Sequence, residues 1–247
     1  MAFEWQELWC KDTVDGTIAA SCLGEGRAQT YLDWLVSAWG WTLAVSAIGL
    51  VLALAIGSLM GVLRTTRRKP LVLIGECWTE LFRNLPLIVQ LFLWFFVIAE
   101  FIPAMKQLPN YLLAALGLGF FTSARISEQV RAGIMAIPSG QRAAGMALGL
   151  SQWQTYRFVL LPVAFRTIIP PLTSEAMSLV KNSSVAFALS VLELTQFARQ
   201  VGEETSRPTE VYAIVTLLYF VSAFSVYLLA TVIERAVRVP GVAGVAK

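Results

Sequence analysis

The pattern of apolar and polar positions divides the chain into five long apolar segments separated by shorter polar ones. The segments lie at residues 36–63, 85–102, 111–135, 163–190 and 211–233. Each is long enough to form a helix that crosses a bilayer core about 30 Å thick. The pattern therefore predicts an all-α integral membrane protein with about five transmembrane helices, with four or six as the alternatives.

Two of these segments carry residues that predict special helix geometry. Pro170 and Pro171 remove backbone donors in the fourth segment, so we expect a kink or a break there. Irregular backbone at membrane depth is tolerated where it lines a cavity, which makes residues 173–184 a candidate for a translocation path. The first segment carries a ridge of small residues that allows another helix to approach closely, either from this chain or from a second subunit. The ridge consists of Gly49, Ala53, Gly57 and Gly61.

The polar segment at residues 138–162, called the hairpin below, predicts two short helices rather than an irregular loop. Ser139 is placed to cap the first helix, and Ser151 with Gln154 forms an S-x-x-Q capping box for the second. Gly149 supplies the left-handed residue that ends the first helix. A capped helical hairpin at this position is typical of a rigid docking element.

The composition of the hairpin indicates which surface would dock. Small residues leave one face low enough for another surface to approach; they are Ala143, Ala144, Gly145 and Ala147. Trp153, Tyr156 and Leu160 recur at helical spacing, and we expect them to anchor the second helix. A soluble partner protein suits this knob, and an amphipathic hairpin lying on the membrane surface is the alternative.

The composition excludes an ordinary soluble domain. Hydrophobic residues make up 57% of the chain and charged residues only 14%, against about a quarter charged in globular proteins. The absence of histidine excludes a histidine-based metal or catalytic site. The net charge of +3 follows from membrane topology and predicts no nucleic-acid partner.

Lysine and arginine gather on one side of the predicted membrane. They follow the first segment, lie in the hairpin, and follow the last segment: Arg64, Arg67, Arg68, Lys69, Arg142, Arg157, Arg235 and Arg238. With five spans, the positive-inside rule places the hairpin and the C-terminus in the cytoplasm and the N-terminus in the periplasm. The predicted organisation is an N-terminal periplasmic or interfacial segment at 1–35, a transmembrane domain at 36–235 and a cytoplasmic tail at 236–247.

The N-terminal segment lacks the pattern of a cleaved signal peptide, so we expect none. Cys10 and Cys22 both fall in this outward-facing segment, where they either form a disulfide or remain free thiols. Cys77 is expected to be structural. Residues 71–84 are apolar but interrupted by charges, which predicts a helix at the cytoplasmic interface, with Arg83 and Asn84 as interfacial structure rather than ligand contacts.

Four separated motifs and the hairpin resemble those of one protein family, and they occur along the chain in the same order as in that family. The motifs are GWTLAVS at 40–46, ELFRNLPLIVQLFLWFF at 80–96, SARISEQVRAGIMAIPSGQ at 123–141 and PPLTSEAMSLVKNSSVAFALSVLEL at 170–194. They are similar to permease subunits of ATP-binding-cassette (ABC) importers of the polar-amino-acid branch. The variants ELFRN, SARxxEQVRA and LVKNS are shared with glutamate/aspartate importer permeases of Gram-negative bacteria. The hairpin resembles the "EAA" loop of this family, with Ala143 in place of the usual Glu and Gly145 in place of the last Ala.

The resemblance implies a type I ABC importer permease fold in the bacterial inner membrane. It implies a subunit without catalytic chemistry or a cofactor, which works with three partners: a second permease, related or identical; a cytoplasmic ABC ATPase dimer that hydrolyses ATP; and a periplasmic amino-acid-binding protein. The coupling residues carried over by the resemblance are Ala143, Ala144, Gly145, Gly149, Leu161 and Pro162.

Two departures from the family pattern predict an anionic substrate. The family usually has Tyr at the position of Arg125 and often Asp at that of Asn182, so this chain carries more positive charge there. Because a guanidinium can hold a carboxylate through two hydrogen bonds, we expect Arg125 to bind a substrate carboxylate. Asn182 and Ser183 would be neutral hydrogen-bond partners, and Glu175 would bind the α-ammonium. Alternatively, Arg125 and Glu128, three residues apart on one helix face, simply pair with each other.

The sequence leaves other functions open. Glutamate and aspartate are the leading substrates, with glutamine or a wider range of polar amino acids as alternatives. An ion-coupled secondary amino acid transporter would use Glu128 and Glu175 as coupling groups, since charges within spans are often functional. A membrane-embedded enzyme has less support, because no nucleophile–base pair or metal-ligand cluster is evident.

Overall fold

The computed structural model describes residues 30–237, and every element within this range is a helix. The predicted pairing of Cys10 with Cys22 lies outside the described residues. Cys77 is a free, exposed thiol on α2 (Lys69–Arg83). The all-α prediction is confirmed.

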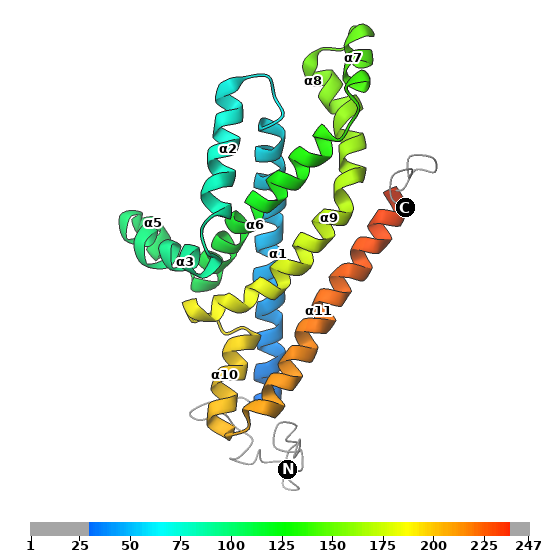
Figure 1. The fold of residues 1–247 in the computed structure, drawn as a ribbon. Helices are drawn as coiled ribbons and strands as arrows, with labels where there is room; N and C mark the ends of the chain where they lie inside the picture. Colours follow the sequence, from blue (N-terminus) through cyan, green and yellow to red (C-terminus); the bar gives the residue numbers. More distant parts are fainter. Residues whose placement is uncertain (1–29, 238–247) are drawn as a thin grey trace. The chain divides into compact units, whose positions relative to one another are not determined.

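The elements follow one another in Figure 1 as a series of long helices joined by short ones. They are α1 (Tyr31–Leu63), α2 (Lys69–Arg83), α3 (Leu87–Phe92), the π-helical η3 (Leu93–Ile98), α4 (Ala99–Phe101), α5 (Pro103–Lys106), α6 (Asn110–Met135), α7 (Ser139–Ala147), α8 (Gln152–Thr155), the π-helical η4 (Tyr156–Leu160), α9 (Leu161–Asn182), the 3-10 helix η5 (Ser183–Leu189), α10 (Leu194–Thr205) and α11 (Pro208–Val237).

Each of the five predicted apolar segments corresponds to a helix or a run of helices. Within the described part of the chain, α1 and α11 are long and apolar enough on their own to cross a membrane. The number rises to as many as four if two bent helix pairs, Lys69–Arg83 with Leu87–Phe101 and Gln152–Leu189 with Leu194–Thr205, each count as one span. The third segment forms α6 but carries three charges, and the count of five spans stays a prediction.

The prolines of α9 do not break the helix. Pro170 and Pro171 lie inside a helix that continues to Asn182. Of the predicted kink or break, the break is therefore wrong, and the kink stays a prediction. Ala164 and Ile168 on one side of the prolines, and Leu179 on the other, are buried in one apolar cluster. This burial holds the turns on both sides in helical form. The irregular backbone comes after Asn182 instead, where α9 passes into a 3-10 helix.

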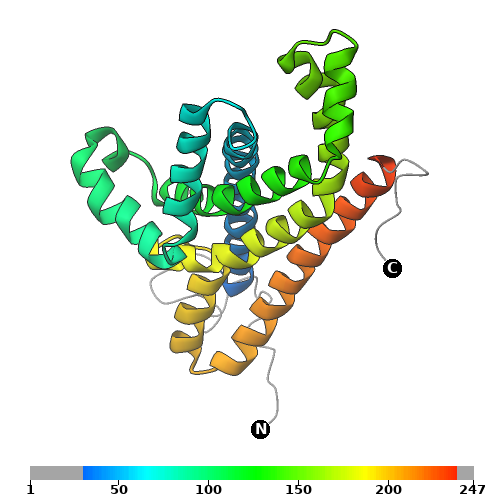
Figure 2. The ribbon, with the colours of Figure 1, turned by 45° about the horizontal axis from the view of Figure 1, so that its top comes forward.

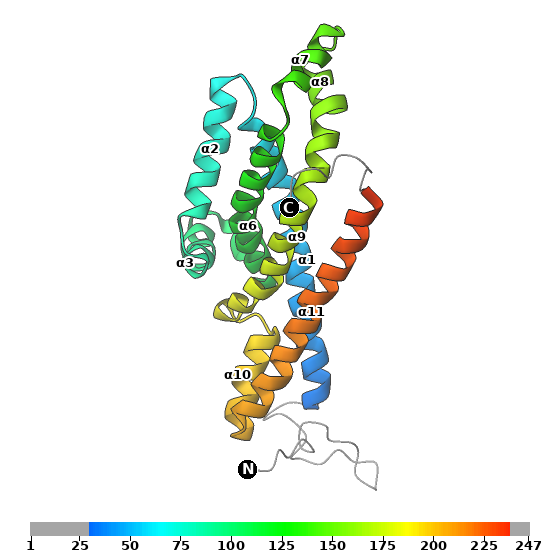
Figure 3. The same cartoon turned by 45° about the vertical axis from the view of Figure 1, so that its right-hand side comes forward.

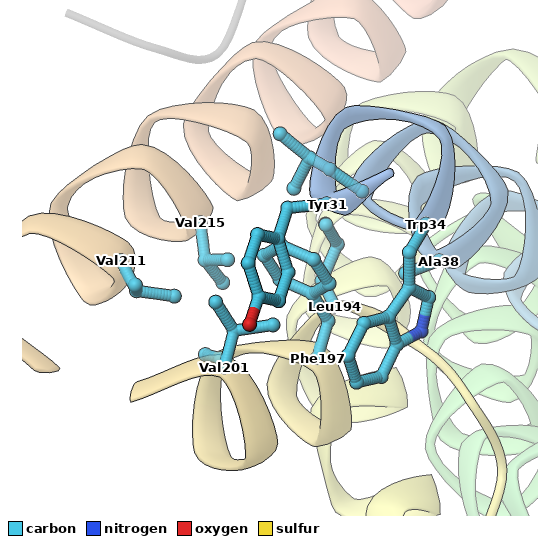
Figure 4. Packing of buried hydrophobic residues seen from close by; sticks show 10 residues of the cluster. Tyr31, Trp34, Ala38, Leu194, Phe197, Val201, Val211 and Val215 are labelled. Atoms are coloured by element: carbon cyan, nitrogen blue, oxygen red, sulfur yellow. The ribbon is translucent and has the colours of Figure 1, made fainter. Parts of the chain in front are cut away.

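The described residues group into two units, each with its own core. The first unit comprises residues 30–48, 87–118 and 180–223. In one of its clusters, Tyr31 and Trp34 of α1 pack against Phe197 of α10 and Val211 and Val215 of α11 (Figure 4). The rings of Trp34 and Phe197 meet edge to face with centroids 5.1 Å apart. The amphipathic α10 therefore lies between two long apolar helices.

A second cluster of the first unit joins α3, α6 and the 3-10 helix η5. Its buried members are Val45, Leu91, Ala114, Ala115, Leu118, Ala186, Leu189 and Val191. The Asn110 side chain donates a hydrogen bond to the Leu189 carbonyl over 2.9 Å and so ties the start of α6 to the end of η5. Apolar packing therefore dominates this unit.

The second unit comprises residues 49–86, 119–179 and 224–237, and its core depends on close helix approach. A Cβ added to Gly57 would lie 2.7 Å from the Ser123 carbonyl oxygen, and one at Gly61 would lie 2.8 Å from that of Ser127. These two members of the small-residue ridge therefore face α6 of the same chain. In Figure 2, α2 (cyan) crosses the green α6, and Trp78 of α2 donates a 2.9 Å hydrogen bond to Ser123 of α6.

Candidate substrate and coupling sites

The second unit contains a polar cavity of about 420 Å³ between the end of α2, α6 and α9. Its lining residues are Arg83, Asn84, Phe121, Arg125, Glu128, Gln129 and Glu175. Three members of this set, Arg125, Glu128 and Glu175, were singled out by sequence, whereas Arg83 and Asn84 were expected to be interfacial structure. The structure thus brings two arginines and two glutamates to one cavity.

Arg125 and Glu175 form one ion pair of this cavity. The Nε atom of Arg125 donates to Oε2 of Glu175 over 2.7 Å. The Glu175 side chain is only 7% exposed, whereas that of Arg125 is 49% exposed. The carboxylate is therefore held inside the protein, whereas the guanidinium lines the cavity, and within residues 30–237 its two terminal nitrogens make no hydrogen bond.

Arg83 and Glu128 form the second ion pair. The Nη1 atom of Arg83 contacts Oε1 of Glu128, and its Nε atom lies 3.2 Å from Oε2 of Glu80. The alternative prediction that Arg125 pairs with Glu128 is therefore wrong, since each has a different partner. The reason is tertiary: α2 brings Arg83 to Glu128, and α9 brings Glu175 to Arg125.

A third guanidinium lies behind Glu128 and is almost fully buried. The Arg64 side chain is 4% exposed, and its Nη2 atom is 4.0 Å from Oε1 of Glu128. Its Nη1 atom donates to the hydroxyls of Thr79 and Ser127 over 3.4 Å each, and its Nε atom has no acceptor among the described residues. Burial, followed by repulsion from Arg131, lowers the pKa of the Arg64 guanidinium below its usual value. Arg64 is therefore a buried cation whose hydrogen bonding is incomplete.

Asn182 and Ser183, the other predicted ligand residues, belong to the first unit. Asn182 is the last residue of α9, seven residues after Glu175. The Ser183 side chain is fully buried, and its hydroxyl donates to the Val180 carbonyl over 2.7 Å. The hydroxyl therefore already has a partner in the last turn of α9, and the ligand roles of both residues stay predictions.

The hairpin is helical as predicted, and it lies at the ends of α6 and α9 (Figure 3). Ser151 and Gln154 form the capping box in full, with the Gln154 amide 3.2 Å from the Ser151 hydroxyl. Gly149 has φ of +80°, as expected for the residue that ends the first helix. The predicted cap at Ser139 is wrong, because Ser139 is already the first helical residue and Pro138 precedes it without a side-chain hydrogen bond.

One of the three residues that were expected to anchor the second helix of the hairpin lies on the surface instead. Trp153 is 70% exposed, whereas Tyr156 and Leu160 are buried. Trp153 therefore joins the exposed Ala143 and Ala144 on the outer surface instead of anchoring the helix. Of the other proposed coupling residues, Gly145 is buried against Thr155, Gly149 and Pro162 are exposed, and Leu161 packs at the edge of the apolar cluster of the second unit.

Tyr156 connects the hairpin to the rest of the second unit. Its hydroxyl donates to the Thr65 carbonyl over 2.5 Å, directly after the end of α1. The Arg142 guanidinium lies over the Tyr156 ring, 5.2 Å from its centroid. The two helical arms of the hairpin are thereby in contact with each other and with the loop after α1.

A polytopic helical protein with a structured hairpin and a charged cavity within its helices has the features of a transport protein. The chain matches the family described as "Binding-protein-dependent transport system inner membrane component" over residues 49–239. The protein therefore belongs to this family of inner-membrane transport components.

Individual relatives cover most of the chain. It is 41% identical over 222 residues to the glutamate/aspartate import permease protein GltJ of Escherichia coli strain K12, which covers 86% of this chain and 90% of that protein. It is 34% identical over 180 residues to the probable glutamine ABC transporter permease protein GlnM of Bacillus subtilis strain 168, covering 73% of this chain and 82% of that protein.

Solved structures agree on the fold. A crystal structure of an amino acid ABC transporter with histidines has a chain with a TM-score of 0.74 and 27% identity, covering 83% of this chain and 95% of that chain. An inward-facing MetNI methionine ABC transporter has a chain with a TM-score of 0.72 and 24% identity, covering 84% of this chain and 98% of that chain. The fold is thus that of an ABC importer permease.

Proposed function

We propose that this protein is the permease subunit of an ATP-driven importer and that it forms a translocation pathway for acidic amino acids, glutamate and aspartate first. The observation that carries the substrate assignment is the charged cavity, where the half-exposed Arg125 extends from a buried carboxylate. A guanidinium so placed can hold a substrate carboxylate through its two terminal nitrogens. The glutamate/aspartate permease among the relatives supports the same substrate class.

In this proposal, Glu175 has two tasks. It orients Arg125 through the 2.7 Å ion pair, and it offers negative charge to the α-ammonium of the same substrate. Asn182 and Ser183 remain proposed hydrogen-bond partners farther along the chain. The ion-coupled secondary transporter is set aside, because family membership and the capped hairpin both favour coupling to a separate ATPase.

The proposed complex contains a second permease, related or identical, two cytoplasmic ATPase subunits and a periplasmic binding protein. The hairpin faces the cytoplasm, the N-terminus faces the periplasm, and the ATPase docks on the exposed small residues of α7. ATP binding would move the docked hairpin, and the Tyr156–Thr65 contact would pass this movement to the end of α1. Such a lever needs different contacts in two states to shift the equilibrium between them.

The test is ATP hydrolysis and uptake in proteoliposomes that contain this chain with its partner permease and ATPase. Purified binding protein would be added with glutamate, aspartate, glutamine or arginine. We expect stimulation by the two acidic amino acids alone. Stimulation by glutamine or arginine would keep the importer and reject the acidic substrate class. Uptake driven by an ion gradient in the absence of the ATPase would reject the importer itself.

A single substitution tests the role of Arg125. We expect Arg125→Ala to reduce glutamate uptake about tenfold or more, which corresponds to the loss of about 1.4 kcal/mol from a charged hydrogen bond. Arg131→Ala is the matched control, since Arg131 is exposed on the same helix and does not line the cavity. Full uptake by Arg125→Ala at normal membrane levels would refute the carboxylate assignment.

A further inference from the structure

The cavity contains a second arginine that the proposed function does not use. Arg83 is 40% exposed, lines the same cavity as Arg125, and is held by Glu128, which is itself 42% exposed. A carboxylate on an exposed guanidinium occupies the position that a ligand carboxylate would take. Glu128 can therefore be regarded as an internal stand-in for an anionic ligand at Arg83.

Glu128 has a second cation to which it can move. Its Oε1 atom, the atom that contacts Arg83, is also 4.0 Å from Nη2 of the buried Arg64. Arg64 lacks an acceptor at Nε and makes only long hydrogen bonds, of 3.4 Å, to Thr79 and Ser127. A buried charge without adequate partners is energetically costly. A carboxylate that moves to the buried Arg64 therefore gains more free energy than a carboxylate that moves from one exposed cation to another.

The residues around Arg64 hold its side chain in place but leave its hydrogen bonding incomplete. Thr79 and Ser127 hydrogen-bond to each other over 2.9 Å, which commits part of their capacity and leaves less for the guanidinium. A Cβ at Gly75 would lie 2.6 Å from Cγ of Arg64, so the absent side chain at this position makes room for the arginine stem. Glu128 is the nearest carboxylate that can complete the site, because it alone forms an ion pair with Arg64 among the described residues.

We propose that Arg83 binds the second carboxylate of a dicarboxylic amino acid, and that the displaced Glu128 moves to Arg64. This inference rests on the proposed function, in which Arg125 binds the first carboxylate. The two arginines then recognise the two carboxylates of one substrate, and Glu175 remains for its ammonium group. Binding is linked to a change at the end of α1, since Arg64 directly follows that helix. An amino acid with one carboxylate would leave the Arg83–Glu128 pair intact.

The proposed movement of Glu128 from Arg83 to Arg64 predicts opposite changes in glutamate affinity for two substitutions. An ion pair that only supports the fold does not predict this. Because Glu128 competes with the substrate for Arg83, Glu128→Gln removes the competitor and should tighten glutamate binding. Arg83→Gln removes the binding group and should weaken it. If the pair only supported the fold, both substitutions would weaken binding or leave it unchanged.

The experiment measures equilibrium binding of radiolabelled glutamate to the full transporter complex in lipid nanodiscs, without the binding protein. We expect Arg83→Gln to weaken glutamate binding about tenfold, the loss of one charged contact, and Glu128→Gln to tighten it severalfold. Arg83→Lys, which keeps the charge but not the paired hydrogen bonds, should lie between Arg83→Gln and the unmodified chain. Arg166→Gln removes an equal charge at an exposed position of α9 outside the cavity and should have no effect. Size-exclusion profiles and melting temperatures would confirm that each variant assembles.

The outcomes separate the inference from the proposed function. If the unmodified complex binds glutamate and Arg125→Ala abolishes it, but Glu128→Gln also weakens binding or Arg83→Gln leaves it unchanged, the exchange is refuted and the acidic substrate stands. If the unmodified complex shows no preference for glutamate over glutamine, both the exchange and the acidic substrate class are refuted, and the importer stands. If Arg83→Gln weakens the binding of glutamate more than the binding of glutamine, the result would support recognition of the second carboxylate by Arg83.

Discussion

Glu193 and Arg64 are both buried charged groups, one in each unit, but their hydrogen bonding differs. Glu193 is fully buried and caps α10 by accepting from the amides of Thr195 and Gln196, each over 2.9 Å. It also accepts a 2.6 Å hydrogen bond from the Tyr219 hydroxyl of α11. A carboxylate at the start of a helix is favoured by the orphan amides and by the helix dipole. Glu193 therefore has strong partners for both of its oxygens.

Arg64 has no comparable set of partners. One of its nitrogens has no acceptor, and its nearest carboxylate is shared with Arg83. The comparison distinguishes two uses of a buried charge. Where every bond is made, as at Glu193, the charge fixes the position of a helix; where bonds are missing, as at Arg64, a second arrangement of similar energy is within reach.

The largest expected effect on stability comes from removing the Glu193 carboxylate, whose hydrogen bonds are all made. Glu193→Ala leaves two amides and the Tyr219 hydroxyl without their acceptor, and we expect it to lower the free energy of unfolding by about 3 kcal/mol. Glu193→Gln keeps one acceptor oxygen and should cost less. Detergent-induced unfolding of the purified chain measures both, and equal losses for the two variants would show that the cap contributes little.

The second effect tests the space that holds Arg64. In Gly75→Ala, the new methyl group would lie 2.6 Å from Cγ of Arg64 and 2.8 Å from the Met60 carbonyl oxygen, so a shift is unavoidable. Overpacking of this kind costs about 2 kcal/mol. Gly140→Ala, at a position with nothing within 4 Å, is the matched control. Unfolding curves that coincide for the two variants would contradict the close approach of α2 to Arg64.

A smaller effect follows from removing one donor of the satisfied site. Tyr219→Phe keeps the ring and deletes the hydroxyl that donates to Glu193. A hydrogen bond to a charged group contributes about 1.5 kcal/mol, and we expect a loss of stability of that size with little change in transport. Unfolding and uptake measured on the same preparation test this. A transport defect larger than the stability defect would mean that the Glu193 site is also part of the transport cycle.

The smallest effect on stability is expected at the unsatisfied site. Arg64→Met replaces a poorly paired buried cation by an apolar side chain. Because Glu128 is 42% exposed and keeps its ion pair with Arg83, no uncompensated buried charge remains, and we expect stability to change by less than about 1 kcal/mol or to rise. Transport should nevertheless fall, because Glu128 loses the cation to which it moves. Unfolding and glutamate uptake give the two readouts. If Arg64→Met lost stability while the remaining folded protein took up glutamate normally, Arg64 would be a structural charge like Glu193, and its role in transport would be refuted.

The helices were predictable because they follow from apolar length. Long apolar segments predicted α1, α6, α9 and α11, and local rules predicted the capping box of α8 and the left-handed Gly149. These features depend on residues within about one helical turn of each other, and the sequence displays such relations directly. The short α10 was missed, because its polar face and its 12 residues give no sign of a membrane span.

The partners of the site residues were not predictable in the same way. Arg125 pairs with Glu175 across 50 residues, and Arg83 pairs with Glu128 across 45. Spacing within α6 favoured Arg125 with Glu128, but packing against α2 and α9 decided otherwise. Arg83 was set aside because a charge at the predicted interface has an ordinary explanation in solvation. The motif ELFRN, which places it directly before an apolar segment, was the available signal.

The length of α1 has a consequence for the lipid around the protein. Its 33 residues extend about 50 Å at 1.5 Å per residue, whereas the hydrocarbon core of a bilayer is about 30 Å thick. A helix with this excess accommodates by tilting, by projecting into the headgroup region or by thickening the bilayer locally. The end that precedes Arg64 is then sensitive to acyl-chain length, and the turnover of this permease should vary with the thickness of the membrane in which it is reconstituted.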